Sequence, residues 1–184
     1  MGLGKVGSLV AILLHETGFD VTGADINDSI DLPVKKRKID LIKPYTLHQM
    51  MKNFDAVISC LPYNLNKTVA SVAHELGMHY FDLTEDIETS KAIIKMSKNG
   101  RAIMAPQCGL APGFIAIVGV SLAEAFEKIR NIKLRVGALP QHPTGLLGYA
   151  FNWSPEGVVN EYLNDCEVIE DGHRKFISPL EWLE

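Results

Sequence analysis

The chain has 184 residues, of which 47% are hydrophobic and 22% charged, and its formal net charge at pH 7 is -4. This length suits one large domain or two small ones, and the acidic balance gives no reason to expect a nucleic acid partner. No stretch approaches the roughly 20 apolar residues of a membrane span, and no secretory pattern opens the chain, so we expect a cytoplasmic protein without membrane contact. Three scattered cysteines and six scattered histidines predict neither a disulfide framework nor a metal site.

Three glycines, at positions 2, 4 and 7, open the chain. Their spacing is typical of the turn between a strand and a helix in a dinucleotide-binding βαβ unit. The amides at the N-terminus of the helix, with the helix dipole, would bind the phosphates. The alternative is a glycine turn that serves packing alone. The predicted cofactor contacts are Gly2, Gly4, Lys5, Val6 and Gly7.

A helix and a strand should follow this turn. Apolar residues at positions 6, 10, 13 and 14 have helical spacing, and Gly18 provides a stop. Residues 19–25 predict a short strand that ends in Asp25, where such motifs place a ribose-binding carboxylate. Because this carboxylate would repel a 2′-phosphate, Asp25 favours NAD over NADP; the alternative is a solvated aspartate that begins a turn. The basic run at residues 35–38 is expected to be a solvated loop, whose cations could reverse the cofactor preference.

Strands and helices alternate from there to residue 105. Only a short connection separates Asp25 from the next strand, so a loop or single turn should replace the usual crossover helix. The alternation predicts an α/β fold with a Rossmann-type doubly wound parallel sheet. The strand before Gly2 is absent, so we expect a fragment. Strands are predicted at residues 38–42, 55–61, 79–83 and 101–105, and helices at residues 47–53, 66–76 and 88–97.

A turn-rich segment at residues 106–113 breaks this alternation, and a long apolar helix at residues 114–126 follows it. We place a domain boundary here, with a dinucleotide-binding domain over residues 1–108 and part of an α/β substrate and dimerisation domain over residues 109–184. The elements predicted beyond the apolar helix are a strand at 131–139, a loop at 140–148, a helix at 155–163 with Ser154 as its cap, and a hairpin at 166–177.

Several motifs along the chain are typical of a single protein family. They are the opening glycine turn, Cys60-Leu-Pro62, His79-Tyr-Phe-Asp-Leu83, Cys108-Gly-Leu-Ala-Pro-Gly113, Leu139-Pro140 and Tyr149-Ala-Phe-Asn-Trp-Ser-Pro-Glu-Gly157. Together they resemble the saccharopine dehydrogenase-like proteins, most closely the lysine 6-dehydrogenase-like subgroup. The resemblance implies a nicotinamide-binding Rossmann domain, a second domain that contacts the substrate and forms a homodimer, and action on lysine, saccharopine or a related amino acid. Members are longer, so we expect this chain alone to bind dinucleotide weakly and to turn over no amino acid.

The chemistry that the resemblance implies is hydride transfer from a nitrogen-bearing carbon to nicotinamide, which gives an imine that water hydrolyses. The protein must orient the amine carbon, hold a substrate carboxylate and handle protons. Asp82, at a strand end beside the expected cleft, is a candidate for proton handling or amine binding; a cap of the following helix is the alternative. Cys108 looks like the family's substrate-facing cysteine, which need not be a nucleophile; a small buried residue in a strained turn is the alternative.

The other expected contacts follow from the same resemblance. Leu61 and Pro62 would contact the cofactor. The residues expected to receive the carboxylate and stem of the substrate are Arg135, Tyr149, Asn152, Trp153 and Ser154. Trp153 is equally suited to a place in the core, and Ser154 to the cap of a helix.

Two functions remain open. The first is an NAD(P)-dependent amino-acid dehydrogenase, and the second is a truncated dinucleotide-binding or dimerisation module without catalysis.

Overall fold

The computed structural model describes residues 1–27, 29–41, 44–137, 139–146, 148–151 and 154–181. The chain divides into two compact units, residues 1–134 and residues 135–184. The first unit therefore contains the apolar helix after residue 113 together with the α/β core. The domain boundary after residue 108 marks a change of sequence pattern and stays a prediction. No helix in the described ranges is both long and apolar enough to cross a bilayer.

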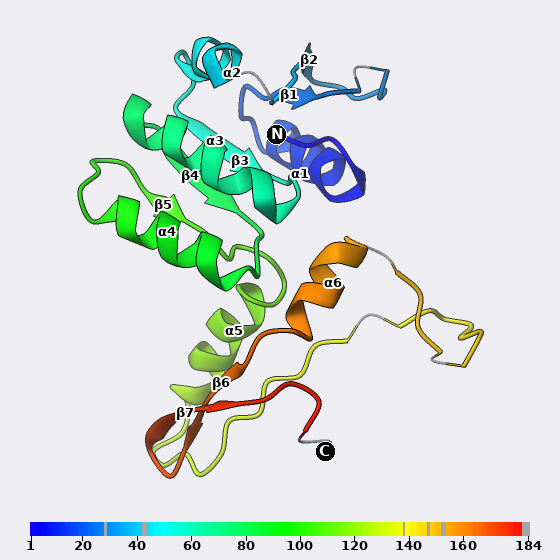
Figure 1. Ribbon diagram of the computed structural model, residues 1–184, viewed down its shortest axis with the longest axis vertical. Helices are drawn as coiled ribbons and strands as arrows, with labels where there is room; N and C mark the ends of the chain where they lie inside the picture. The colour runs from blue at the N-terminus through cyan, green and yellow to red at the C-terminus, as the bar shows by residue number, and fades with distance from the viewer. Residues whose placement is uncertain (28, 42–43, 138, 147, 152–153, 182–184) are drawn as a thin grey trace. The chain divides into compact units, whose positions relative to one another are not determined.

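The first unit alternates strands and helices as the sequence predicts (Figure 1). The described residues between the first two strands, 26–27 and 29–34, contain no helix, which confirms the short crossover. The elements are α1 (Lys5–Glu16), β1 (Thr22–Asp25), β2 (Lys35–Lys38), α2 (Pro44–Met51), β3 (Ala56–Ser59), α3 (Tyr63–Leu76), β4 (His79–Asp82), α4 (Ile87–Ser97), β5 (Met104–Ala105) and α5 (Phe114–Ala123).

The strands of the first unit form two parallel sheets, one of β1 and β2 and the other of β3, β4 and β5. The first two residues of the chain bridge these sheets. The nitrogen of Met1 donates to the Ile58 carbonyl at 2.6 Å, the Cys60 amide donates to the Met1 carbonyl at 2.8 Å, and the Gly2 amide donates to the Ala24 carbonyl at 2.9 Å. The order β2, β1, residues 1–2, β3, β4, β5 is that of a doubly wound dinucleotide fold, with two residues in the place of the first strand.

The core lies where α3 and α4 pack on the sheet of β3, β4 and β5, and where α2 packs on α3. α3 contributes Val69, Ala70 and Ala73, which are fully buried, and it ends at Gly77 in the left-handed conformation with φ of 66°. Leu47 of α2 and Ile93 of α4 are also fully buried in this cluster. This packing fixes the carboxyl ends of β3 and β4, from which the candidate site residues extend.

One expectation for the N-terminal part was wrong. Residues 35–38 form the strand β2, not a solvated loop, and this strand ends where the predicted one begins. All four of its side chains are exposed, so an edge position lets a strand carry four cations. In α1, the small residues Gly7 and Ala11 face inward, whereas Val6 and Leu13 are about half exposed. Close packing of the helix thus selects small side chains over large apolar ones.

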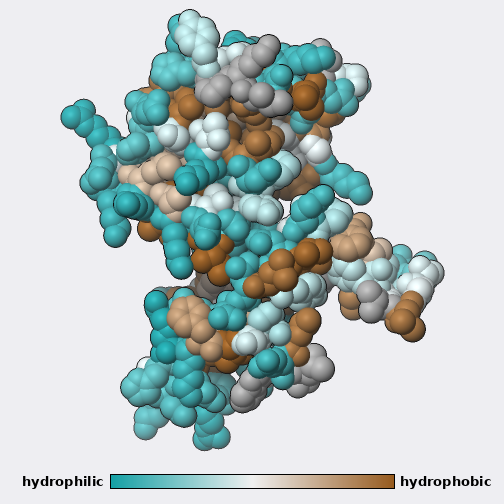
Figure 2. All heavy atoms as spheres, viewed as in Figure 1, coloured by the Kyte–Doolittle hydropathy of each residue, from teal (hydrophilic) through white to brown (hydrophobic). Residues whose placement is uncertain are grey.

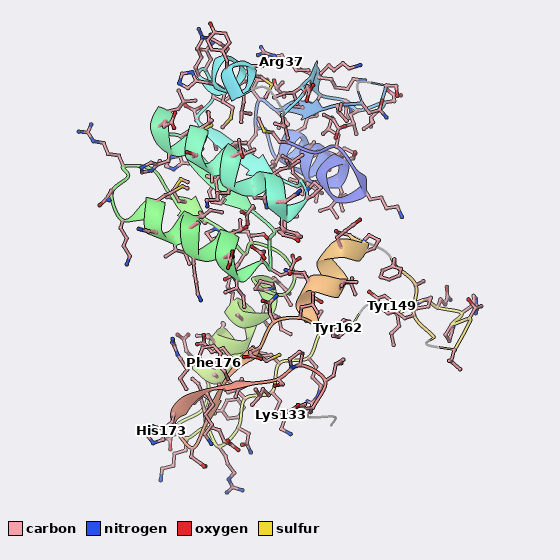
Figure 3. All side chains as sticks on the ribbon, viewed as in Figure 1. Arg37, Lys133, Tyr149, Tyr162, His173 and Phe176 are labelled. Atoms are coloured by element: carbon pink, nitrogen blue, oxygen red, sulfur yellow. The ribbon has the colours of Figure 1, made fainter. Side chains whose placement is uncertain are left out.

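The second unit contains α6 (Pro155–Glu161), β6 (Cys166–Glu170) and β7 (His173–Ile177). The two strands pair antiparallel, which confirms the predicted hairpin. The predicted strand at 131–139 is absent from its described part, residues 131–137 and 139. Tyr149 lies on the long loop, away from His173 and Phe176 on β7 (Figure 3). Apolar residues also lie at the molecular surface on the face drawn in Figure 2.

Candidate functional site

The glycine turn divides its three glycines between two tasks. Gly2 has φ of 79°, and a Cβ there would lie 2.7 Å from the Cys60 carbonyl oxygen. A Cβ on Gly7 would lie 1.7 Å from the Gly2 carbonyl oxygen, so α1 packs on the turn itself. Gly4, by contrast, has no atom within 4 Å of the place of a Cβ. The outer two glycines therefore serve the protein's own packing, and the middle one leaves the helix end open to a ligand.

The N-terminus of α1 presents backbone donors at this opening. Gly4 caps the helix without a side-chain hydrogen bond, and the first helical bond runs from the Ser8 amide to the Gly4 carbonyl at 2.9 Å. The amides of Lys5, Val6 and Gly7 have no acceptor within the helix. Because the helix dipole adds partial positive charge there, the turn suits a phosphate group.

Asp25 connects β1 to the glycine turn. Its Oδ2 accepts a hydrogen bond from the Leu3 amide at 2.6 Å, and its Oδ1 accepts one from the Asn27 amide at 2.8 Å. Asp25 thus begins a turn, as its alternative interpretation held, and it also holds the glycine loop. Each oxygen keeps a further lone pair for a ligand hydroxyl.

Basic side chains flank Asp25 on the neighbouring strand. Lys38 stands opposite Asp25 in the parallel register of β1 and β2. Lys35 forms an ion pair with Asp20 at 3.0 Å, and the Arg37 guanidinium lies 5.7 Å from the centre of the Phe54 ring (Arg37 is labelled in Figure 3). This positive strand offsets the negative charge of the Asp25 carboxylate, so the position does not simply repel a phosphate.

The loop after β3 lies at the same edge as the glycine turn. A Cβ on Gly2 would lie 3.2 Å from the Leu61 amide nitrogen, which places Leu61 beside the turn. Pro62 follows, is exposed, and caps the N-terminus of α3. Cys60 packs against the glycines, since its Cβ would lie 3.2 Å from a Cβ on Gly7, and burial raises the pKa of its thiol.

Asp82 is fully buried at the end of β4 and makes four hydrogen bonds. Oδ2 accepts from the Tyr80 hydroxyl at 2.7 Å, and Oδ1 accepts from the Thr84 amide at 3.0 Å and the Gln107 amide at 3.2 Å. Its carbonyl accepts from the Cys108 amide at 2.7 Å. Burial raises the pKa of Asp82, and these donors to the carboxylate oppose that shift. Asp82 therefore anchors the segment that carries Cys108.

The helix-cap alternative for Asp82 was wrong. Asp86 caps α4, and its Oδ2 accepts from the Thr89 amide at 2.8 Å. Three acidic residues, Asp82, Glu85 and Asp86, precede this helix. The structure assigns the cap to Asp86, because it stands directly before the first helical residue, Ile87.

Cys108 is exposed, which excludes the alternative of a small buried residue. Partial burial and the nearby Asp82 carboxylate both raise the pKa of its thiol. The thiol is therefore protonated at neutral pH and is not an activated nucleophile. Its surrounding turn is tight, since Gln107 has φ of 63° and a Cβ on Gly113 would lie 2.4 Å from the Gly109 carbonyl oxygen.

The expected substrate contacts lie in the second unit, whereas Asp82 and Cys108 lie in the first. Arg135 is exposed, and Tyr149 packs edge-to-face on Phe151 with ring centres 5.6 Å apart. Ser154 Oγ accepts from the Gly157 amide at 3.1 Å, which confirms its alternative role as a helix cap. Asn152 and Trp153 lie outside the described residues.

Sequence reasoning missed three buried polar residues next to Asp82. The Ser59 hydroxyl donates to Asn66 Oδ1 at 2.7 Å, and the Tyr80 hydroxyl lies 3.3 Å from the Asn66 carbonyl oxygen as well as close to Asp82. The available signal was the spacing of Tyr80 and Asp82, because residues two apart in a strand share one face.

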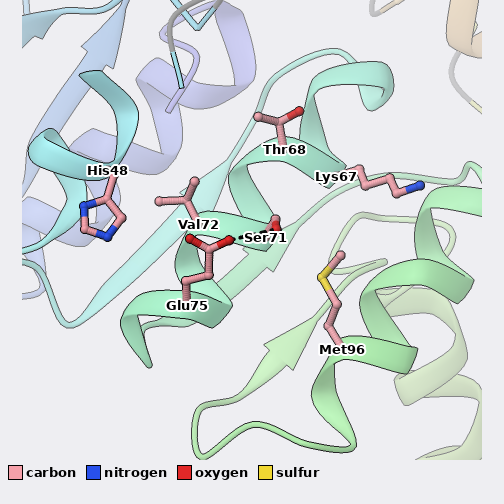
Figure 4. A pocket seen from close by; sticks show the side chains of 7 residues that line it. All are labelled: His48, Lys67, Thr68, Ser71, Val72, Glu75 and Met96. Atoms are coloured by element: carbon pink, nitrogen blue, oxygen red, sulfur yellow. Dashed lines mark hydrogen bonds between the residues drawn. The ribbon is translucent and has the colours of Figure 1, made fainter. Parts of the chain in front are cut away.

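A groove on the helical layer contains none of the predicted site residues (Figure 4). It has a volume of about 430 Å³ and lies between α2, α3 and α4. Within the described residues, no group of three or more histidine, cysteine or acidic side chains is placed to hold a metal ion. The groove is lined by His48, Lys67, Thr68, Ser71, Val72, Glu75 and Met96.

Comparisons with known proteins agree with this architecture. Residues 1–105 match the saccharopine dehydrogenase NADP binding domain, and residues 109–183 match the saccharopine dehydrogenase C-terminal domain. The expectation of NAD over NADP is not supported, because the matched domain is described as NADP binding.

Curated relatives share the sequence at low identity. Mouse mitochondrial alpha-aminoadipic semialdehyde synthase is 23% identical over 94% of this chain, which spans 20% of that protein. Saccharopine dehydrogenase (NADP(+), L-glutamate-forming) from Schizosaccharomyces pombe is 26% identical over 73% of this chain, which spans 31% of that protein. The chain thus spans between a fifth and a third of the length of these relatives.

A solved structure shares the fold. Apo saccharopine dehydrogenase (L-Glu forming) from Saccharomyces cerevisiae superposes with a TM-score of 0.63 at 21% identity, over 96% of this chain and 43% of the yeast chain. The closer relation to lysine 6-dehydrogenases stays a prediction. With both halves matched by its domain models, this chain belongs to the saccharopine dehydrogenase family.

Proposed function

We propose that this chain belongs to an NAD(P)-dependent oxidoreductase that transfers hydride between an amine-bearing carbon of an amino acid and nicotinamide. The observation that carries the proposal is the glycine turn, in which Gly2 and Gly7 are closed by packing and Gly4 is open. The family of the chain supports a dinucleotide as the ligand of this turn. A nicotinamide supplies the hydride acceptor, and the residues described here bind and orient.

On the cofactor side, the amides at the start of α1 hold the pyrophosphate, and Leu61 and Pro62 line the adjoining edge. Asp25 receives ribose hydroxyls beside the glycine loop that it stabilises. In place of a preference for NAD, we propose that NADP is accepted, because Lys38 stands beside Asp25. Lys38→Ala should then weaken NADPH binding about tenfold and leave NADH binding unchanged, as titrations of both cofactors would show.

On the substrate side, Cys108 presents a neutral thiol, and Asp82 holds the segment that carries it. This assigns Asp82 to positioning, because its carboxylate is buried and occupied by protein donors. Arg135 is the cation proposed for the substrate carboxylate. Tyr149, Asn152, Trp153 and Ser154 are proposed for its stem. The substrate is lysine, saccharopine or a related amino acid, and a screen of these with the absorbance of reduced cofactor as readout would identify it.

The decisive experiment compares two glycine-to-alanine variants with the wild type. Gly4→Ala meets no protein atom, so the variant should fold like the wild type, yet its methyl group would occupy the space of the phosphates. We expect dinucleotide affinity to fall at least about tenfold in calorimetric titration, with an unchanged melting temperature. Gly137→Ala, which also meets no atom, is the matched control and should leave both unchanged. Wild-type affinity in Gly4→Ala would rule out the turn as the phosphate site.

A second candidate is a dinucleotide-binding or dimerisation module without catalysis. The observation that favours it is α5, an apolar helix with no buried residue, which suits association with a second copy. Amino-acid-dependent reduction of the cofactor separates the two functions. The dehydrogenase shows turnover with at least one amino acid, whereas the module binds dinucleotide and associates without turnover.

A further inference from the structure

Tyr80 and Asp82 form a buried pair at the end of β4. Both residues are fully buried, and the Tyr80 hydroxyl donates to Asp82 Oδ2 at 2.7 Å. They share one face of the strand because they are two residues apart. The hydroxyl also lies 3.3 Å from the Asn66 carbonyl oxygen, which keeps the ring of Tyr80 between α3 and the carboxylate.

The two oxygens of the Asp82 carboxylate have separate partners. Three hydrogen bonds to this carboxylate are described. Oδ2 accepts the one from the Tyr80 hydroxyl, and Oδ1 accepts the two from the amides of Thr84 and Gln107. Rotation of the carboxylate would therefore exchange these partners. Gln107 has φ of 63°, a conformation that non-glycine residues rarely adopt, so its backbone depends on such external contacts.

We propose that Tyr80 is a positioning residue, whose hydroxyl fixes the rotation of the Asp82 carboxylate and thereby holds the backbone that carries Cys108. The inference rests on the proposed function, in which Cys108 faces the substrate. Burial and the adjacent carboxylate raise the pKa of Tyr80 well above its ordinary value, so the hydroxyl remains protonated and able to donate. Ser59 completes the arrangement, since it holds the Asn66 side chain at 2.7 Å.

The test measures amide hydrogen exchange of the whole chain without cofactor or substrate. Tyr80→Phe removes one oxygen and retains the ring. We expect exchange at Gln107 to accelerate about tenfold, with a smaller increase at Thr84, because both amides lose an oriented acceptor. Thr89, whose amide is held by Asp86, should be unchanged. Tyr45→Phe, at an exposed position, is the matched control.

A double-mutant cycle separates positioning from a general structural effect. In the Asp82→Asn background, Tyr80→Phe should add less than about twofold at Gln107, because the group through which it acts is gone. The same tenfold acceleration in that background would overturn the proposal, as would unchanged exchange in Tyr80→Phe alone. If Tyr80→Phe fails to fold, Asp82→Asn alone must accelerate Gln107 and leave Thr89 unchanged; equal acceleration at both also overturns it.

A second measurement relates the inference to the thiol. In a Cys166→Ser background, alkylation of the exposed Cys108 should change severalfold in rate with Tyr80→Phe and not with Tyr45→Phe. An unchanged rate would overturn the connection to Cys108. Because neither readout needs cofactor or turnover, loss of the dehydrogenase proposal would leave these results standing, and the reverse also holds.

Discussion

Helices α4 and α5 have nearly equal lengths, 11 and 10 residues, but they differ in burial: α4 has buried residues and α5 has none. α4 mixes charged and apolar residues, yet it buries Thr89, Ser90 and Ile93. α5 is apolar over almost its whole length and buries none of its residues. Burial in the first unit is therefore decided by whether a helix lies on the sheet of β3, β4 and β5, and apolar content alone does not bring a helix there.

The segments that lead into the two helices also differ in burial. Residues 82–86 lead into α4 with a buried aspartate at one end and a side-chain cap at the other. Residues 106–113 lead into α5 with an exposed cysteine and with Gly113 as the capping residue. The first connection serves stability. The second leaves Cys108 and the apolar surface of α5 available to ligands or partners.

The largest expected effect comes from a pair of identical substitutions. Ile93 in α4 is 0% exposed and Ile117 in α5 is 71% exposed. Ile93→Ala should lower the free energy of unfolding by about 2–5 kcal/mol, because it removes buried methyl groups and leaves a cavity. Ile117→Ala should change it by less than about 0.5 kcal/mol. Urea denaturation of the two variants measures the difference, and equal effects would show that α5 is buried after all.

The comparison also predicts association through α5. A homodimer that covers this helix would bury Ile117 and Val120, so Ile117→Asp should weaken association by about 2 kcal/mol or more. Light scattering across the micromolar range gives the mass of each variant. Tyr45→Asp, on an exposed position of α2, is the control and should associate like the wild type. A wild-type chain that stays monomeric over this range would remove the homodimer proposal.

A smaller effect is expected at the start of α4. Asp86→Ala removes the acceptor of the Thr89 amide and should cost about 0.5–2 kcal/mol of stability. Asp86→Asn retains an acceptor and should cost less. Thermal melts of the two variants provide the measurement, and an Asp86→Ala variant as stable as the wild type would mean that the cap contributes nothing.

The smallest effect is a pH dependence from Asp82. Because burial raises the pKa of this carboxyl above its usual 3.8, the folded state holds the proton more tightly than the unfolded state. Stability from this group is therefore present below pH 3.8 and decreases as pH rises through the higher folded-state pKa. Asp82→Asn should flatten that decrease in denaturation curves measured between pH 4 and neutrality. A steeper decrease in the variant would contradict the direction of the shift.

Local signals in the sequence were sufficient for much of the fold and for the glycine turn. The alternation of strands and helices, the hairpin and the caps at Gly77 and Ser154 all depend on residues close in sequence. The strand β2 was missed because four consecutive cations resemble a solvated loop, and only an edge position permits them.

The remaining errors concern contacts between distant residues. The hydrogen bond between Asp82 and Gln107 joins residues 25 apart in sequence, and no local pattern reveals it. The same holds for Tyr80 and Asn66, 14 residues apart. The exposure of α5 was also invisible, because its composition is that of a buried helix. The sequence does not show which helix faces and strand edges become covered when the chain folds.

The basic strand β2 has a consequence for the behaviour of the protein in concentrated solution. Among the described residues, no strand pairs with the outer edge of β2, so its backbone donors and acceptors offer a template for another chain. Like charges repel when two such strands approach, and four exposed lysine and arginine side chains therefore act against edge-to-edge aggregation. The basic residues that flank Asp25 would in this way also keep the protein colloidally stable, and neutralising them would favour fibrous or amorphous precipitation.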